Sequence, residues 1–414
     1  VSIDIFKHRD GDKMGKLFEI EWIKFKKNKK NKLLLLLLIL YIVILVFYNQ
    51  KQYKNYFSKM SQAMNEEKIK ANSRLKMIEL FMKNDEDYSS NPLEQSYLNK
   101  EIQKSTLLGY YYKEKDFADW RRFLQIENEK YSNLILGEEN NFIDKKVLYA
   151  RGQGPLELKS KIIRNEYFID NNIEPYINPY ELNGVNFLIL LLKNNNPVIL
   201  IAFLALFAID IFSGEMEEGS YKLYYTQPLS RACIFWSKII STLIFIVGLT
   251  LSIVFIGFFI ISLIYGVGDF TYPQIIGLSK GLLASLNSII FLGEFKIISS
   301  LEYIIKGYIL LFLIATMLIL FIISLSILFK SISINLGAFA SIFLLDYVLN
   351  IFLNFESMFR FYLPLNYMRV GLILSGEINA SYIAGIQISL ICSVLLLIIN
   401  CNLFVKKDLI GGNI

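Results

Sequence analysis

The chain has 414 residues, of which 54% are hydrophobic and only 19% charged, and its formal net charge at pH 7 is +6. A soluble domain usually has about 45–50% apolar and about 25% charged residues, so this composition excludes a string of ordinary globular domains. It also excludes collagen-like, disordered and disulfide-rich chains, and it indicates a protein that crosses a membrane.

The charged residues are concentrated in two parts of the chain. Residues 1–32 hold ten basic and five acidic residues, and residues 49–185 hold 42 of the 80 charged residues, half of each sign. Because the basic excess is local to the N-terminal part, it gives no reason to expect nucleic-acid binding. Cys233, Cys392 and Cys401 all lie outside residues 49–185, so no disulfide is expected there, and no metal-site spacing is present.

Six segments are apolar enough to cross a bilayer, which takes about 20 helical residues. The first, residues 33–48, follows a lysine-rich stretch and lacks a small-residue cleavage site, so we expect an uncleaved membrane anchor. Residues 354–381 contain Pro364, Gly371 and Gly376 and are expected to form a broken helical hairpin before the last span. The other five predicted spans are about 197–212, 234–265, 303–329, 332–353 and 382–405.

The positions of lysines predict the orientation of the chain. Six lysines lie between positions 24 and 32, just before the first span, and such a cluster stays in the cytoplasm. With six spans both termini are then cytoplasmic, which agrees with Lys330 between the fourth and fifth spans and with Lys406 and Lys407 after the last. Residues 49–185 are therefore expected outside the cytoplasm.

The predicted fold is an all-α polytopic membrane protein with six transmembrane helices and a large, mostly helical extracytoplasmic domain between the first and second. Residues 51–83 and 93–136 have apolar side chains at helical spacing, so the first span is expected to continue outward as an amphipathic helix. For the last third of the domain, the sequence does not distinguish helices from strands. The predicted units are a cytoplasmic basic tail at 1–32, the first span at 33–48, the extracytoplasmic domain at 49–185 and a membrane core at 186–414.

The segment between the second and third spans carries the clearest pattern, FSGEMEEGSYKLYYTQPLSRACIFWSKII at residues 212–240. Ser213 is placed to cap a short helix whose first turn holds glutamates, near the positive end of the helix dipole. Gly219 allows that helix to stop, and Pro228 ends one helix and opens the next. We expect a helical elbow at 213–231 in the cytoplasmic interface; the alternative is a plain amphipathic connector. Its defining residues are Glu215, Glu218, Gly219, Tyr221, Gln227, Pro228, Ser230, Arg231 and the downstream Lys238.

The order of these residues resembles the signature of ABC-2 type transporter permeases, in which an acidic-Gly helix, a Pro-x-Ser-Arg turn and a downstream Lys join the second and third spans. Ser220-Tyr221 and Tyr224-Tyr225 depart mildly from the Gly-Thr and Leu-Leu pairs of many relatives. The resemblance covers about residues 1–48 and 186–414. It implies the membrane subunit of a bacterial ABC exporter, with a separate cytosolic ATPase docked on the elbow.

The resemblance also implies the partners of the chain. Two permease copies, identical or different, form the path, and two cytosolic ATPase subunits bind them. Residues 1–414 contain no G-x-x-x-x-G-K-[ST] phosphate loop, so ATP and Mg²⁺ are expected on the partner, no cofactor on this chain, and no enzyme activity of its own. We expect a homodimer in the bacterial cell membrane, in contact with the lipid bilayer.

The substrate is expected to be an antimicrobial or toxin-like peptide, moved for export or self-immunity, because a bulky charged outer domain favours a cargo handled at the outer face. One alternative is an exporter of a lipid or an amphipathic drug. Another is a membrane sensor or scaffold whose outer domain binds a ligand.

Four residues within the spans are further candidates. Asp346, in the fifth span, either lines the path or forms a packing hydrogen bond to a neighbouring helix. Asp210, near the end of the second span, can reach the interface and is expected to be structural. Gly337 and Ser341, four positions apart, are a candidate dimer face, with generic helix packing as the alternative. An intramembrane enzyme using the two aspartates is disfavoured because neither lies in a recognisable protease motif, so no catalytic residue or metal ligand is expected.

Overall fold

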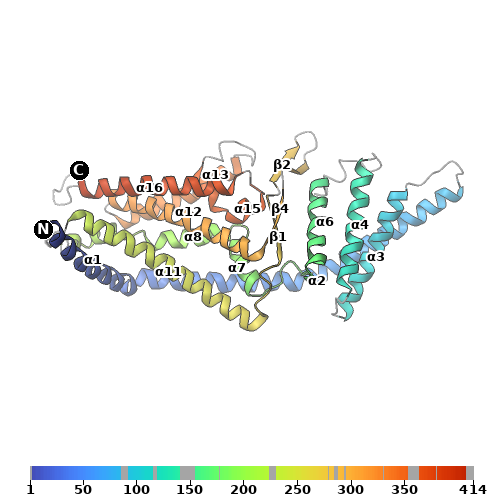
Figure 1. The fold of residues 1–414 in the computed structure, drawn as a ribbon, viewed down its shortest axis with the longest axis horizontal. Helices are drawn as coiled ribbons and strands as arrows, with labels where there is room; N and C mark the ends of the chain where they lie inside the picture. The colour runs from blue at the N-terminus through green and yellow to red at the C-terminus, as the bar shows by residue number, and fades with distance from the viewer. Residues whose placement is uncertain are drawn as a thin grey trace.

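The structure is a computed structural model, and its described residues are mostly helical (Figure 1). Five described helices are long and apolar enough to cross a membrane, and one bent helix pair is a sixth candidate, in agreement with the predicted number of spans. The described residues are 2–84, 92–114, 119–139, 154–176, 178–222, 230–277, 279–283, 288–292, 295–329, 331–352, 363–378 and 380–406.

The molecule is elongated, with a helical bundle at one end and a smaller group of helices at the other (Figure 1). Both termini lie at the far end of the bundle, which we call the terminal end. Helix α2, Lys29–Asn84, has 56 residues and joins the two parts. Its length of about 84 Å exceeds the hydrocarbon core of about 30 Å. The first span therefore continues as one helix well beyond a bilayer, as the sequence predicts.

The small group of helices packs around the distal half of α2. It comprises α3 (Pro92–Glu114), α4 (Trp120–Glu139) and α6 (Pro155–Asp170). Helix α6 begins with a proline, which suits the first helical turn because no intrahelical partner is lost there. Since α6 fills most of the described last third of residues 49–185, that part is helical rather than stranded.

A buried ion pair joins α3 and α4. Lys104 Nζ lies 2.8 Å from Glu127 Oε1, and the Glu127 carboxylate also accepts hydrogen bonds from Tyr131 and Asn165 at 2.9 and 3.1 Å. Burial alone raises the pKa of the Glu127 carboxyl, but Lys104 and the two hydrogen bonds outweigh burial and lower this pKa to about 2.

The helical group is therefore expected to lose stability in acid. A carboxyl whose pKa is depressed in the folded state stabilises the fold above its unfolded pKa of 4.5, and this is lost as the pH falls toward about 2. Going from about pH 6 to about pH 3 is expected to cost about 2 kcal/mol, measured in the full chain as lower protection factors of the α4 amides, which compare each exchange rate with the intrinsic rate at the same pH. Glu127→Gln should flatten this dependence; an equal slope in the variant contradicts the assignment.

The second span is bent, and its predicted extent of 197–212 is wrong. Apolar helix begins earlier, with α7 (Gly184–Leu192), whose first turn is capped by the Asn183 side chain accepting from Asn186 N at 2.8 Å. The chain then breaks at Asn194, which has a left-handed φ of 54°, and α8 (Asn196–Phe207) leaves at 77° to α7. A capping asparagine and a left-handed asparagine are polar signals that an apolar run does not reveal.

Helix α12, Ser300–Leu328, is the most buried of the candidate spans. It packs against α7, α8, α13 (Ile332–Phe352) and α16 (Tyr382–Lys406). The predicted broken hairpin is present where the structure describes it, as a 3₁₀ turn at Pro364–Met368 and α15 at Val370–Ser375. Gly376 ends α15 with a left-handed φ of 83°, a conformation that favours glycine.

The prediction of an all-α fold is wrong for the segment between α11 (Arg231–Tyr265) and α12. This segment forms two antiparallel strand pairs: β1 (Pro273–Ile276) with β4 (Lys296–Ser299), and β2 (Ser279–Leu283) with β3 (Ser288–Leu292). Short isoleucine-rich runs separated by glycine and asparagine favour hairpins over helix. The predicted spans end before this segment and begin after it, so no structure is predicted for it.

The predicted N-terminal tail is also a helix, α1, Ser2–Lys27, packed on α11. Phe18, Trp22 and Phe25 place their rings 5.0, 4.6 and 5.7 Å from the ring of Phe245 on α11. The three aromatic residues recur at helical spacing, so one face of α1 is apolar although the segment is basic overall.

Candidate functional site

The predicted acidic elbow begins with a short helix, α9, Ser213–Glu217. Ser213 does not cap this helix as predicted, because Phe212 holds the N-cap position and the buried Ser213 hydroxyl donates to Ile209 O at 3.1 Å. Two residues after the helix, Gly219 has a φ of +70°, which lets the chain turn away from α9. The short helix and its glycine stop therefore lie where the sequence indicates.

Glu215 joins α9 to two other helices through a compact charge cluster. Its Oε1 atom lies 2.7 Å from Lys24 Nζ on α1 and 2.5 Å from Lys238 Nζ on α11. Glu21 on α1 completes the cluster, with its carboxylate 3.3 Å from Lys238 Nζ. The Lys238 side chain is only 3% exposed, so its charge depends on these two carboxylates.

Two further contacts tie α9 to α12 and α13. The hydroxyl of Ser326, fully buried on α12, accepts hydrogen bonds from Phe212 N at 3.2 Å and Ser213 N at 2.8 Å. Glu217 Oε1 accepts from Ile332 N at 3.0 Å and so satisfies a free amide at the start of α13. A five-residue helix is thereby fixed to α1, α11, α12 and α13.

The second half of the elbow leads into α11. Ser230 is the N-cap of α11 and accepts from Cys233 N at 3.2 Å, as the sequence predicts for a helix start. Arg231 is the first helical residue, and its guanidinium donates to Val405 O at the end of α16 at 2.9 Å. Glu218 is exposed and Tyr221 half-buried against the bundle. Gln227 and Pro228 lie outside the described residues.

Asp210 anchors the turn that precedes the elbow. Its carboxylate accepts a hydrogen bond from Asn28 Nδ2 at 3.0 Å and pairs with Lys30 Nζ. The same ammonium also donates to Leu206 O and Phe207 O at 3.2 and 3.4 Å, so it caps the end of α8. Both contacts of the Asp210 carboxylate join it to the end of α1 or the start of α2.

The sequence interpretation missed the partners of these acidic residues. Lys24 and Lys30 are counted there only as orientation charges, and Glu21 and Ser326 are not singled out. A signal for Glu21 and Lys24 is present, because both alternate along α1 with the aromatic residues that pack on α11, whereas Lys30 lies on α2. Nothing in the sequence indicates that Ser326 meets a turn more than one hundred residues away.

A family model described as ABC-2 family transporter protein matches residues 17–409. The chain belongs to the ABC-2 family of transporter membrane proteins. The matched range includes residues 49–185, which the resemblance at the elbow does not cover. No curated protein and no solved structure shows a significant match to the chain.

The permease is thus a transport subunit of the class that pairs with an ABC ATPase. Among the described residues, no group of three or more His, Cys, Asp or Glu side chains is arranged to hold a metal ion. In the described part of the elbow, Glu215 pairs with two lysines, and Glu217 and Arg231 bind backbone groups, whereas Glu218 is exposed.

Asp346 of the permease forms an ion pair that the sequence interpretation did not include. Arg369, at the start of α15, donates to its two carboxylate oxygens at 3.2 and 2.7 Å. Both side chains are nearly buried, with 9% and 13% of their surfaces exposed. The pair joins α13 to the broken hairpin, which is a packing contact like the second of the two predicted alternatives, although its partner is the hairpin rather than a span.

Gly337 and Ser341 lie exposed on α13. A methyl group added at Gly337 meets no atom within 4 Å, so this glycine does not serve close packing inside the described chain. Beside Ser341 an apolar groove of about 460 Å³ runs between α12, α13 and α16. Residues that line it include Phe321, Leu345 and Leu396.

Proposed function

We propose that the permease is the membrane half of an ATP-driven bacterial exporter, and that its cytosolic ATPase docks on the elbow at residues 213–231. In this proposal the terminal end faces the cytoplasm, residues 49–185 lie outside the cell membrane, and two permease copies work with two ATPase subunits. ATP and Mg²⁺ are bound by the ATPase.

The contacts of α9 are the observation that carries this proposal. Glu215, Glu217 and the Phe212–Ser213 backbone join α9 to four different helices of the bundle. Glu217 and Glu218, at the end of α9, are exposed and available to a partner protein. A force applied there is passed to the spans without passing through a flexible loop, which is what a nucleotide-driven subunit requires of its docking element. A sensor or scaffold needs no such joint.

The charge distribution supports the orientation. The lysines before the first span lie at the terminal end, whereas residues 49–185 carry equal numbers of acidic and basic residues. Cytoplasmic ends of membrane proteins carry an excess of lysine and arginine.

The open face of α13 supports a second permease copy. Gly337 and Ser341 lie on this exposed face, and small residues allow close approach of two helices within a bilayer. A homodimer through α13 uses this face in both copies, as twofold symmetry requires.

The proposed substrate is an antimicrobial or toxin-like peptide. A cavity lined by amide and aromatic side chains lies between the distal helices and the bundle and supports a peptide over a lipid. A lipid or amphipathic drug is the second candidate, because the groove beside α13 is apolar and lies within the spans.

Reversing one exposed and one partly buried charge of the elbow is expected to abolish ATPase binding. In Glu218→Lys with Arg231→Glu, the net charge is kept while the docking surface is inverted. The ATPase that co-purifies with the wild-type chain from its native membrane is expected to be lost, while insertion and dimerisation persist.

The matched control is Glu166→Lys with Lys159→Glu, a charge swap between two exposed residues of α6. It should leave ATPase co-purification unchanged. Co-purification that survives the elbow swap would sink the docking assignment. If gentle extraction yields no ATPase with the wild type, the sensor or scaffold alternative takes its place.

A further inference from the structure

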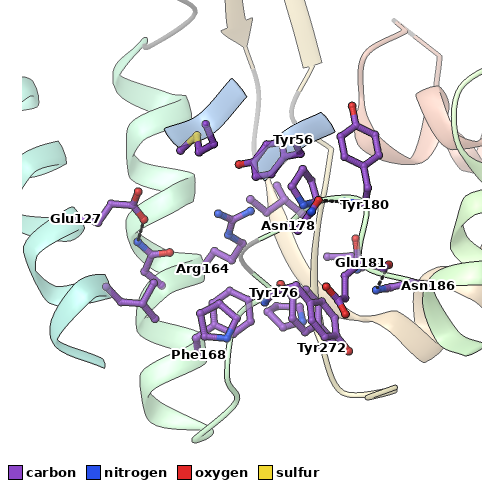
Figure 2. Close-up of a pocket in the computed structure, with 18 of the residues that line it drawn as sticks. Tyr56, Glu127, Arg164, Phe168, Tyr176, Asn178, Tyr180, Glu181, Asn186 and Tyr272 are labelled. Atoms are coloured by element: carbon purple, nitrogen blue, oxygen red, sulfur yellow. Dashed lines mark hydrogen bonds between the residues drawn. The ribbon is translucent and has the colours of Figure 1, made fainter. Parts of the chain in front are cut away.

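A cavity of about 500 Å³ lies where the distal helices meet the bundle (Figure 2). Its walls come from α2, α3, α4 and α6 on one side, and from α7, β1 and residues 175–176 and 178–181 on the other. Small-molecule sites typically have about 300–1,000 Å³, so the cavity has room for a ligand and not only for a few waters. Any ligand bound here contacts both parts of the molecule.

Arg164 of α6 extends its guanidinium into the middle of this cavity (Figure 2). Its Nε atom is buried and has no hydrogen-bond partner. A buried guanidinium N–H without an acceptor is costly, because the atom has lost water and gained nothing in exchange. Arg164 is therefore a donor placed for a group that the chain itself does not supply.

The carboxylates around the cavity are already engaged elsewhere. Glu127 is bound by Lys104, Tyr131 and Asn165. The Glu181 carboxyl accepts a hydrogen bond from Tyr53, which lowers its pKa, but burial outweighs this bond and raises the pKa. No described carboxylate forms an ion pair with Arg164, whose guanidinium stays protonated in proteins. The cavity thus favours a negatively charged group.

The polar lining of the cavity is mostly carboxamide. In the described contacts, Asn49 and Asn186 each use one amide N–H, to Tyr180 O and Glu181 O, which leaves the second N–H and the carbonyl oxygen of each amide for another partner. A peptide backbone matches such groups with its own N–H and C=O, whereas an acyl chain leaves them unsatisfied. The carboxamides in the lining are Asn49, Asn165, Asn178, Asn186, Asn194 and Gln274.

Aromatic rings provide the apolar part of the lining. The rings of Tyr176 and Tyr272 stack at 4.4 Å, and Phe168 meets Tyr272 edge-on at 5.0 Å. These rings hold one another in place, so they form a prebuilt surface for apolar side chains.

We propose that this cavity binds the carboxyl end of a peptide, with the Arg164 guanidinium holding the carboxylate, the carboxamides meeting the peptide backbone and the rings contacting its side chains. The assignment rests on the proposed peptide-transport function, and it names the part of the peptide that is recognised. Arginine suits this role because its planar fork donates two parallel hydrogen bonds to a carboxylate.

The test is affinity selection on the full chain in nanodiscs of zwitterionic lipid, with no ATPase present. The probe is a library of random hexapeptides, offered once with free C-terminal carboxylates and once with C-terminal amides, with retained peptides counted by mass spectrometry. Free-acid peptides are expected to be retained about tenfold or more over their amides, the effect of a charge-assisted pair. Arg164→Gln should bring this ratio close to one.

Two further variants make the result specific. Arg164→Lys keeps the positive charge but removes the planar guanidinium, so an intermediate ratio of retained acids to amides is expected. This variant also tests the site if Arg164→Gln does not fold. Lys159→Gln removes an exposed charge from the same helix and should keep the wild-type ratio.

Three outcomes would overturn the proposal: equal retention of acids and amides by the wild type, no retention of either, or a ratio that Arg164→Gln does not change. If acids are not preferred over amides and short-chain phosphatidylglycerol displaces the retained peptides, the cavity binds a lipid phosphate instead. Because no ATPase is present, failure here leaves the docking of the ATPase on the elbow standing, and failure of the elbow swap leaves this site standing.

Discussion

Glu215→Gln is expected to lower the free energy of unfolding by about 3–5 kcal/mol and to uncouple ATP hydrolysis from transport. The substitution removes the carboxylate that lies between the ammonium groups of Lys24 and Lys238. Lys238 is 3% exposed, so the variant leaves a buried ammonium that has lost its nearest carboxylate, with the Glu21 carboxylate 3.3 Å away. The measurements are the midpoint of denaturant unfolding in nanodiscs and the ratio of ATP hydrolysed to substrate moved.

A second variant separates stability from coupling. Glu215→Gln combined with Lys238→Met places an apolar side chain of similar length in the buried position and should recover most of the lost stability. Coupling should stay lost, because the joint between α9 and α11 is still absent. Lys24→Met, at a residue 41% exposed, should cost less than about 1 kcal/mol. Full recovery of coupling in the double variant would contradict the role of Glu215 as a joint.

Helix α12 connects the elbow with the cavity between the distal helices and the bundle. Helix α12 has 29 residues and is about 44 Å long. At one end Ser326 binds the turn before α9, and at the other end Ser300 N donates to Tyr272 O, on the cavity wall, at 2.8 Å. One continuous helix therefore contacts both the elbow and the wall of the cavity.

The spans could be predicted from the sequence because hydrocarbon imposes a strict rule. Backbone groups in a bilayer must be satisfied within a helix, so each apolar run of the right length becomes one. The bend between α7 and α8 could not be predicted by this rule, since it depends on the cap at Asn183 and the left-handed Asn194. The strand pairs after α11 are short, and β1 and β4 pair across the intervening β2–β3 pair, which no local pattern indicates.

The residues of the elbow could be selected from the sequence, but most of the contacts that they form could not be predicted. Glu215 and Lys238 both belong to the predicted set, and their contact joins positions 23 residues apart. Lys24 and Glu21 come from a segment that is predicted as a tail, because a basic segment is usually solvated. The helical spacing of Phe18, Trp22 and Phe25 indicates instead that this segment packs on another helix. Arg164 lies within the domain that composition described only as charged and helical, and neither motif nor spacing distinguishes it from other surface arginines.

Asp346→Ala is expected to destabilise the permease by about 3–5 kcal/mol, seen as a lower unfolding midpoint. The substitution leaves the guanidinium of Arg369, 13% exposed, without the two carboxylate oxygens that it binds at 3.2 and 2.7 Å. The loss should loosen the broken hairpin, because this pair fixes Arg369, at the N-cap of α15, to α13.

Asp346→Leu with Arg369→Met decides between the two roles considered for Asp346. Neutral apolar residues of similar size should restore most of the stability, since a buried ion pair is seldom more stabilising than a well-packed apolar pair. If Asp346 serves packing, transport in reconstituted vesicles should return together with stability. Recovered stability with transport still lost would instead place the carboxylate on the path of the substrate, because a packing residue tolerates an apolar replacement and a residue that contacts cargo does not.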